Sequence, residues 1–224
     1  MKRSYAAITA IGLIVLLTVG VIVVLQPTGL NPNNLSWTID VGNTYEFFIR
    51  VRGESYGGSF TTPQVVPLNG TIISVTVTYL PTFETVRDAE SFSSEIIFRN
   101  KVNCKFANGT ALDEWANTTF CRMISVCLLP IGAWSSLDRL FPDETPSGWN
   151  PGEYAIATML YDTWFFIGYK WWGSIDDSGG WDGETSLSTG IPFDILLYYN
   201  HGMDGQLTIE LTLVGLVLSI MQPS

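Results

Sequence analysis

Aromatic side chains gather in one short stretch of the sequence, residues 164–172, which reads Trp-Phe-Phe-Ile-Gly-Tyr-Lys-Trp-Trp. In an extended chain successive side chains point to opposite faces, so both faces of this stretch would carry aromatic rings. One face can enter a core, and the other then needs a second layer, a ligand or a partner to cover it. Aromatic rings stack on sugars and grip acyl chains, which favours a binding site for a glycan or a lipid, with a packed core as the alternative. The candidate ligand-binding residues are Trp164, Phe166, Tyr169, Trp171, Trp172 and Trp181.

Four carboxylates lie within nine residues, at Asp176, Asp177, Asp182 and Glu184. Calcium takes several hard oxygen ligands on a turning backbone, and the glycines of this segment permit such a turn. The spacing departs from the EF-hand pattern, in which the acidic residues alternate before a fixed glycine. We expect a solvated acidic loop here, with a calcium site at these four residues as the alternative.

The sequence offers little support for catalysis. His201 is the only histidine, and it lies in a predicted turn beside Gly202. A Ser-His-Asp site would have to use this histidine. No phosphate-binding loop is present either. We therefore name no catalytic residue and expect a protein that is not an enzyme.

An apolar run without charge, residues 6–25, follows Lys2 and Arg3. As a helix it would span roughly 30 Å, which is the hydrocarbon thickness of a bilayer. No further Lys or Arg occurs before Arg50, so the positive-inside rule places the N-terminus in the cytoplasm and the rest outside. The run exceeds the apolar stretch of a cleaved signal peptide. We predict an uncleaved signal anchor that places residues 6–26 in the lipid bilayer, with a cleaved signal or a pilin-type leader as alternatives.

These boundaries divide the chain into a cytoplasmic tail (1–5), a transmembrane anchor (6–26), a stalk rich in turn-forming residues (27–36) and one extracellular domain (37–224). Lys2 and Arg3 account for two of the 11 basic residues, so the exported part carries nine basic and 21 acidic residues, a net charge of −12. This balance argues against a nucleic-acid ligand, because phosphate binding needs clustered Lys and Arg.

Four N-glycosylation sequons begin at Asn34, Asn69, Asn108 and Asn117, all on the side that the topology places outside the cell. Two of them read Asn-Gly-Thr, which is also a common turn sequence, so chance turns are the alternative. We predict glycosylation at two or more of these asparagines.

The chain contains three cysteines, Cys104, Cys121 and Cys127, and none of their spacings is typical of a zinc site. Outside the cell a disulfide is the expected state of a cysteine pair. A Cys104–Cys121 disulfide would cross-link the region of the Asn108 turn, and Cys104–Cys127 is the alternative pairing. Three buried free thiols are a further interpretation.

Three segments alternate between apolar and polar residues, at 45–51, 71–80 and 206–213. This period of two with one polar face is typical of antiparallel strands. Further strands are expected at 37–41, 96–106, 118–128 and 193–199, with a pair inside 154–172 that is interrupted at Gly168.

Helix signals are few. Residues 135–141 have apolar residues at helical spacing, and 85–92 is a second, weaker candidate. The balance predicts a mainly β fold: an antiparallel sandwich or a strongly curved sheet (half-barrel) with one or two short helices, preceded by the transmembrane helix. The tail at 211–221 is too short for a second membrane span, and residues 213–221 would form an exposed apolar edge.

The start of the predicted extracellular domain, Trp37 to Phe47, has a Trp, an alternating strand, Gly-Asn and then an aromatic strand. It resembles a recurring start in uncharacterised secreted or signal-anchored surface proteins of Asgard-type archaea. The segments 68–77, 106–110 and 129–134 are similar in order, so the resemblance covers most of the domain through short motifs. It implies a cell-surface β domain with no known catalytic residues. For some such chains it also implies a curved sheet of the lipoprotein-carrier type around a short helix and an apolar cavity.

Together these features predict a membrane-tethered, extracellular, non-enzymatic surface domain that binds a ligand or partner through an aromatic patch or an apolar cavity. The alternative is a structural subunit of a cell-surface filament or envelope layer that self-associates through apolar edges. A secreted hydrolase is the third and weakest candidate.

Overall fold

The computed structural model describes residues 30–54, 65–141, 154–174, 177–201 and 205–217. The predicted anchor at 6–26 lies outside these residues. No helix in the described part has the length and apolar character needed to cross a membrane. Leu30 and Leu35, in the predicted stalk, are 3% and 6% exposed, so this part of the stalk packs on the domain.

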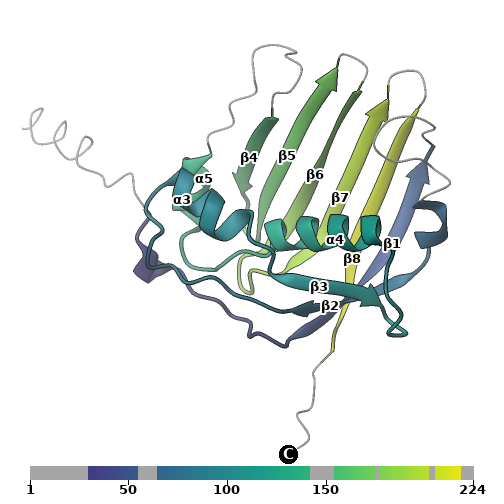
Figure 1. The fold of residues 1–224 in the computed structure, drawn as a ribbon. Helices are drawn as coiled ribbons and strands as arrows, with labels where there is room; N and C mark the ends of the chain where they lie inside the picture. Colours follow the sequence, from purple (N-terminus) through teal and green to yellow (C-terminus); the bar gives the residue numbers. More distant parts are fainter. Residues whose placement is uncertain (1–29, 55–64, 142–153, 175–176, 202–204, 218–224) are drawn as a thin grey trace, which may run out of the picture.

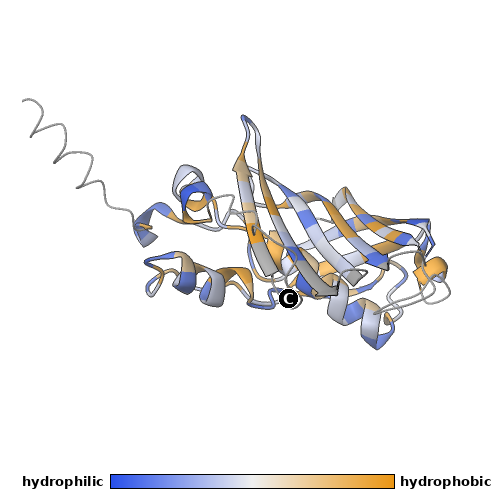
Figure 2. Ribbon diagram, turned by 90° about the horizontal axis from the view of Figure 1, so that it is seen from above, coloured by the Kyte–Doolittle hydropathy of each residue, from blue (hydrophilic) through white to orange (hydrophobic). Residues whose placement is uncertain are grey.

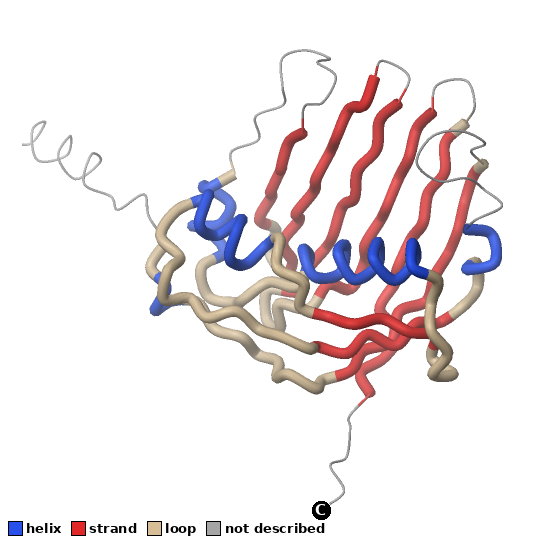
Figure 3. Tube along the Cα trace, in the orientation of Figure 1, coloured by secondary structure: helices blue, strands red, loops and turns tan. Residues whose placement is uncertain are grey.

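The described strands form one antiparallel sheet of eight, in the order β3-β2-β1-β8-β7-β6-β5-β4 (Figures 1 and 3). The strands are β1 (Thr44–Gly53), β2 (Ile72–Val77), β3 (Val102–Phe106), β4 (Tyr154–Leu160), β5 (Trp164–Ser174), β6 (Asp177–Ser186), β7 (Pro192–His201) and β8 (Gln206–Val217). Two meanders, β1–β3 and β4–β8, are joined where β1 pairs with β8, from Thr44↔Val217 to Gly53↔Leu207. Strands from the two ends of the domain therefore lie side by side.

One long helix, α4 (Glu114–Cys127), crosses one face of the sheet and contacts β3, β6 and β7 (Figure 1). We call this face the inner face and the opposite one the outer face. The other helical elements are η1 (Pro32–Asn34), η2 (Val66–Leu68), α3 (Ala89–Phe92), the π-helical turn η3 (Ser93–Ile97) and α5 (Trp134–Leu140). Helix α5 extends the inner layer toward β4 and β5. The ring of Trp134 on α5 packs on the ring of Phe165 on β5, with ring centroids 5.2 Å apart.

The strand alternation decides which side chains enter the core. Figure 2 shows hydrophobic and hydrophilic residues succeeding one another along the strands. The buried inner-face residues of β1 and β8, where the two meanders meet, are Tyr45, Phe47, Ile49, Leu207, Ile209 and Leu211. Opposite them, α4 buries a stripe at helical spacing, formed by Ala116, Phe120, Met123, Ile124 and Cys127. The core therefore lies between the inner face and the helices.

The strand predicted at 118–128 is wrong, because these residues belong to α4. The carboxylate of Asp113 caps the helix by accepting a hydrogen bond from the Ala116 N–H at 2.7 Å. The β-branched residues and cysteines of this segment favour a strand locally. Burial of its apolar stripe against the sheet outweighs that preference, as tertiary packing commonly does.

The mainly β fold is confirmed, but neither of its two predicted forms is. The second layer is α4 rather than a second sheet, so the domain is not a sandwich. The sheet is not closed or strongly curled, so it is not a half-barrel either. The described part of the predicted apolar edge, residues 213–217, belongs to β8 and pairs with β1 on one side, as at Leu213↔Phe47. On the other side the pairs of β8 with β7 end at Thr212.

The strands predicted at 45–51, 71–80, 193–199 and 206–213 are confirmed, as is the helix at 135–141. Of the helix expected at 85–92, only the second half is helical, as α3 (Ala89–Phe92). The pair within 154–172 is confirmed, but the break falls at 161–163 and Gly168 lies inside β5.

Of two further strand predictions, the one at 37–41 is wrong and the one at 96–106 is right only in its second half. No strand forms at 37–41, where the Trp37 indole N–H instead donates to the carbonyl of Pro81 at 2.9 Å. The segment 96–106 begins in η3, and its strand starts only at Val102.

Gly183 on β6 permits the close approach of α4. A Cβ atom at this position would lie 2.2 Å from Cys127 Sγ. We predict that Gly183→Ala lowers the free energy of unfolding by about 1–3 kcal/mol, because the helix must move away from the sheet. Urea denaturation of the full chain in detergent measures the change. The matched control is Gly215→Ala, whose Cβ would meet nothing nearer than Glu46 Oε2 at 3.9 Å. Equal losses in both variants would contradict this account of the packing.

Candidate functional site

The structure places the predicted aromatic residues on both faces of the sheet. Tyr169 and Trp181 lie on the inner face, where their rings stack with centroids 5.5 Å apart and planes 9° apart. Trp164 and Phe166 lie on the outer face, because they alternate with the buried Phe165 of the inner face. Trp171 and Trp172 continue β5, but their side chains are outside the described part. Among the candidate residues whose side chains the structure describes, only Trp164 and Phe166 therefore face away from the layer of described helices.

The outer face of β4 and β5 carries a set of accessible apolar side chains that we call the aromatic platform: Met159, Tyr161, Trp164 and Phe166. Tyr161 follows β4 and stacks on Trp164, with ring centroids 3.7 Å apart and planes 16° apart. Tyr161 is 40% exposed and Met159 is 45% exposed. Phe166 pairs directly with Met159, which makes the platform continuous across the two strands.

Beside the platform, the outer face of β6 and β7 carries four polar side chains that we call the polar cluster: Asp182, Glu184, Asp194 and Tyr198. The sheet register connects the two sets, since Phe166 pairs with Glu184 and Glu184 pairs with Asp194. Two glycines make room for the cluster. Asp182 Oδ1 lies 2.8 Å from where a Cβ of Gly168 would be, and the Tyr198 hydroxyl lies 2.5 Å from that position at Gly180.

Three atoms of the polar cluster are buried and have no hydrogen-bond partner within the described part of the chain. They are Asp182 Oδ1, Asp194 Oδ1 and the Tyr198 hydroxyl oxygen. Buried polar atoms in folded proteins are nearly always hydrogen-bonded, and an unmade bond costs free energy. Three unpaired polar atoms on one patch lower the stability of the fold. Proteins accept such a loss of stability mainly at functional sites, where a ligand can supply the missing hydrogen bonds.

Burial raises the pKa of all three carboxyl groups in the cluster above the usual range. The charge of Asp194 raises the pKa of Glu184 further, and Glu210 on β8 does the same for Asp194. Burial, together with the charge of Asp182, also raises the pKa of the Tyr198 hydroxyl. The cluster therefore resists carrying negative charge, and its oxygens favour neutral hydrogen-bond donors.

The acidic segment predicted as a loop is instead strand β6, and the loop prediction is wrong. Its glycines serve packing rather than a turn, as the approach of Tyr198 to Gly180 shows. Asp182 and Glu184 lie on the outer face, the side chain of Asp177 is not described, and Asp176 is outside the described residues. Within the described residues no group of three acidic, His or Cys side chains is arranged to hold a metal ion.

The three cysteines are buried free thiols, so the predicted disulfide is not formed in this structure. Cys104 on β3 and Cys121 on α4 are nevertheless neighbours. A hydrogen bond between their side chains lowers the pKa of Cys121 and raises that of Cys104. Cys127 instead packs against Gly183 on the sheet. Of the two predicted pairings, the structure therefore brings Cys104 and Cys121 together.

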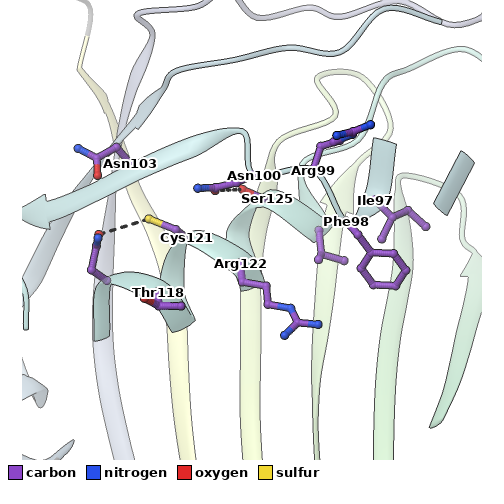
Figure 4. A pocket seen from close by; sticks show the side chains of 11 residues that line it. Ile97, Phe98, Arg99, Asn100, Asn103, Thr118, Cys121, Arg122 and Ser125 are labelled. Carbon is purple, nitrogen blue, oxygen red and sulfur yellow. Dashed lines mark hydrogen bonds between the residues drawn. The ribbon is translucent and has the colours of Figure 1, made fainter. Parts of the chain in front are cut away.

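A pocket of about 390 Å³ lies between α4 and the segment from η3 to β3 (Figure 4). Two adjacent rows of α4 residues form one wall: Asn117, Cys121 and Ser125, with Thr118, Arg122 and Val126. The opposite wall consists of Ile97, Phe98, Arg99, Asn100 and Asn103. Sequence reasoning missed this pocket because it placed a strand where the helix lies.

Lys101 lies behind the pocket and is fully buried. Its Nζ donates to the carbonyl of Ser125 at 2.6 Å and to that of Ile97 at 3.4 Å. The carbonyl of Ser125 is one of the last four of α4, which have no donor within the helix. The amine thus fastens the C-terminal end of α4 to η3. Burial lowers the pKa of Lys101 to about 7.

The four sequon asparagines occupy different settings. Asn34 at the end of η1 and Asn69 and Asn108 in turns are all exposed. Asn117 is half-buried on α4, and its side-chain oxygen accepts a hydrogen bond from the Cys121 thiol at 3.4 Å. Glycosylation stays a prediction for all four, and the structure favours the three exposed ones.

A Gly-x-Ser-x-Gly motif was not expected in this sequence, but Gly53-Glu54-Ser55-Tyr56-Gly57 has that spacing, which is typical of a nucleophile elbow. That motif requires a strand that turns directly into a helix. Gly53 ends β1, residues 55–64 lie outside the described part, and the next described element is the short η2. The single histidine, His201, ends β7, and its side chain is not described. The described residues therefore identify no catalytic group.

No family model matches the chain, and no curated protein or solved structure matches it either. The resemblance to archaeal surface proteins stays a prediction, and the geometry of the site carries the argument alone.

We predict that Asp182→Asn raises the free energy of unfolding at pH 7. Burial raises the pKa of Asp182 in the folded chain above its value in the unfolded chain. At pH 7 the carboxyl must therefore ionise in an unfavourable environment, which lowers the free energy of unfolding of the wild type. The gain should disappear as the pH falls below about 3.9, where the unfolded carboxyl is protonated too. Urea denaturation at both pH values measures it, with Asp162→Asn, an exposed carboxylate, as the control. A variant less stable than the wild type at pH 7 would contradict the prediction.

A second prediction concerns Lys101. Between pH 7 and 9 the Lys101 amine is neutral in the folded chain but protonated in the unfolded chain. A rise in pH therefore disfavours the unfolded chain, and the free energy of unfolding should increase. The stability of the wild type relative to Lys101→Met should increase by up to about 1.4 kcal/mol per pH unit over this window. Lys105→Met, a change at an exposed lysine of β3, should leave the pH profile unchanged. Parallel profiles for the wild type and Lys101→Met would contradict the burial of a titrating amine.

Proposed function

We propose that this chain is a membrane-tethered, extracellular, non-enzymatic binding domain whose outer sheet face binds a neutral glycan. The observation that carries the proposal is the position of three unpartnered buried polar atoms beside the aromatic platform. A sugar presents apolar C–H faces and hydroxyl groups side by side. The platform offers rings for the first and the polar cluster offers oxygens for the second.

The charge of the outer face supports a neutral ligand. Asp182, Glu184 and Asp194 already carry raised pKa values, so an acidic ligand would add repulsion. The cations near the cluster already face carboxylates: Arg50 and Arg52 lie 3.7 and 3.0 Å from Glu210, and the charge of Lys170 on β5 acts on Asp182. Sugar hydroxyls can donate to the carboxylate oxygens without bringing any charge.

The proposed location follows from the sequence. Lys2, Arg3 and the apolar run at 6–25 favour an anchor with the domain outside the cell. Three exposed sequon asparagines agree with a glycosylated surface.

A second candidate, a structural subunit of a surface layer, is favoured by the edge strand β4. Among the described strands it pairs only with β5, and the backbone groups on its other edge are the ones that a strand of a neighbouring molecule would use. The candidate requires association that grows with protein concentration, which size-exclusion chromatography of the full chain measures.

Removal of the outer stacked ring tests the proposed glycan site. We predict that Tyr161→Ala weakens binding to neutral hexasaccharides on a glycan array by about tenfold, roughly 1.4 kcal/mol, because the stack with Trp164 is lost. Oligouronates of the same length should bind neither protein.

The matched control is Tyr79→Ala, which makes the same change at a 50% exposed tyrosine outside the outer-face site. Its binding should equal that of the wild type. Equal losses in the two variants, or a preference for the uronates, would overturn the proposed site.

A further inference from the structure

We propose that the pocket between α4 and the η3–β3 segment is a thiol–disulfide exchange site. It takes a small carboxylate-bearing disulfide and oxidises the Cys104–Cys121 pair. This inference is independent of the glycan site, which lies on the other face of the sheet.

The two thiols have unequal access to the pocket. Cys121 forms part of the pocket wall, whereas Cys104 does not line it (Figure 4). Cys104 instead lies behind Cys121, and the two side chains are hydrogen-bonded. A molecule in the pocket therefore meets Cys121 first, and Cys104 is placed to react second.

Hydrogen bonding prepares Cys121 for ionisation. Hydrogen bonds from the side chain and the backbone of Cys104 lower the pKa of Cys121 and outweigh burial, which raises it. The Cys121 thiol itself donates to Asn117 Oδ1 at 3.4 Å, on the wall of the same pocket. The thiolate is the form of cysteine that attacks a disulfide. Cys127 offers no comparable route, because it is fully buried and its sulfur packs against the backbone at Gly183.

The lining of the pocket selects the ligand. It contains two guanidinium groups, Arg99 and Arg122, and no carboxylate. Arg99 is paired with Glu95 at 2.8 Å, while Arg122 makes no ion pair or hydrogen bond in the described part of the chain. Its charge is available to a carboxylate. The volume of about 390 Å³ lies in the range of pockets that bind small molecules.

The chemistry consists of two exchange steps. The Cys121 thiolate attacks one sulfur of the ligand disulfide. The ligand S–S bond breaks, a mixed disulfide forms on Cys121, and the leaving thiolate takes up a proton. Cys104 then loses its proton and attacks the Cys121 sulfur, which releases the second half of the ligand as a thiol. Two electrons and two protons pass from the protein to the ligand. The product disulfide joins α4 to the edge strand β3.

Mass spectrometry of acid-quenched full chain in detergent tests the proposal. The probes are 3,3′-dithiodipropionate, which carries two carboxylates, and cystamine, which carries two amines and has a similar size. The wild type should lose two hydrogens and yield a Cys104–Cys121 peptide. Cys104→Ser and Cys104→Ala should both stop at a mixed disulfide on Cys121, and Cys127→Ser should behave like the wild type. A mixed disulfide on Cys104, or oxidation that involves Cys127, would overturn the proposal.

Charge selection is tested at an exposed residue, so folding is not at risk. Arg122→Gln should slow the reaction with dithiodipropionate by about threefold or more, with no slowing of the reaction with cystamine. Arg139→Gln, a matched change on α5, should slow neither reaction. An equal effect of Arg122→Gln on both probes would show that the pocket does not select the carboxylate and would overturn that part of the proposal.

Discussion

The covering of one face of the sheet by α4 is the constraint on which the rest of the structure depends. An eight-stranded sheet with alternating side chains has two different faces, and the described helices pack on only one of them. The inner face consequently holds the apolar core. The outer face keeps accessible aromatic rings. It also carries carboxyl groups whose pKa is raised by burial. This asymmetry places the proposed glycan site on the uncovered side.

The position of α4 depends on a few close contacts rather than on the apolar stripe alone. Gly183 lets the helix approach β6 at Cys127, and the buried amine of Lys101 holds its C-terminal carbonyl at Ser125. On its opposite side the same helix leaves the pocket beside η3 and brings Cys121 next to Cys104. One helix therefore completes the core and creates the second proposed site.

The local pattern of the sequence was sufficient for much of the sheet. Alternation in β1 and β8 identified both the strands and their buried residues, because a half-buried strand imposes a period of two on the sequence. The α5 helix was recognisable for the same reason, since its apolar residues follow a helical period. The aromatic platform could be predicted in part: Trp164 and Phe166 were identified, whereas Tyr161 and Met159 follow only from the register.

The remainder depends on contacts between residues far apart in the sequence. The pairing of β1 with β8 joins the two meanders, and no local pattern encodes it. The residues of α4 favour a strand locally, and only the sheet beneath them selects the helix. The acidic segment appeared to be a loop because of its glycines. Two of these, Gly180 and Gly183, in fact accommodate Tyr198 and Cys127. Lys101 gave no signal at all, because burial of a lysine depends entirely on its neighbours.

The indole N–H resonances of the tryptophans test the central claim most directly, because the two faces of the sheet carry different ones. Trp164 lies on the outer face, whereas the Trp134 indole donates to the carbonyl of Leu187 within the inner layer at 3.1 Å. In an NMR titration of the labelled full chain with a neutral hexasaccharide, the account predicts that the Trp164 resonance shifts while that of Trp134 does not. A shift of Trp134 without Trp164, or no shift of either resonance at saturating sugar, would contradict it.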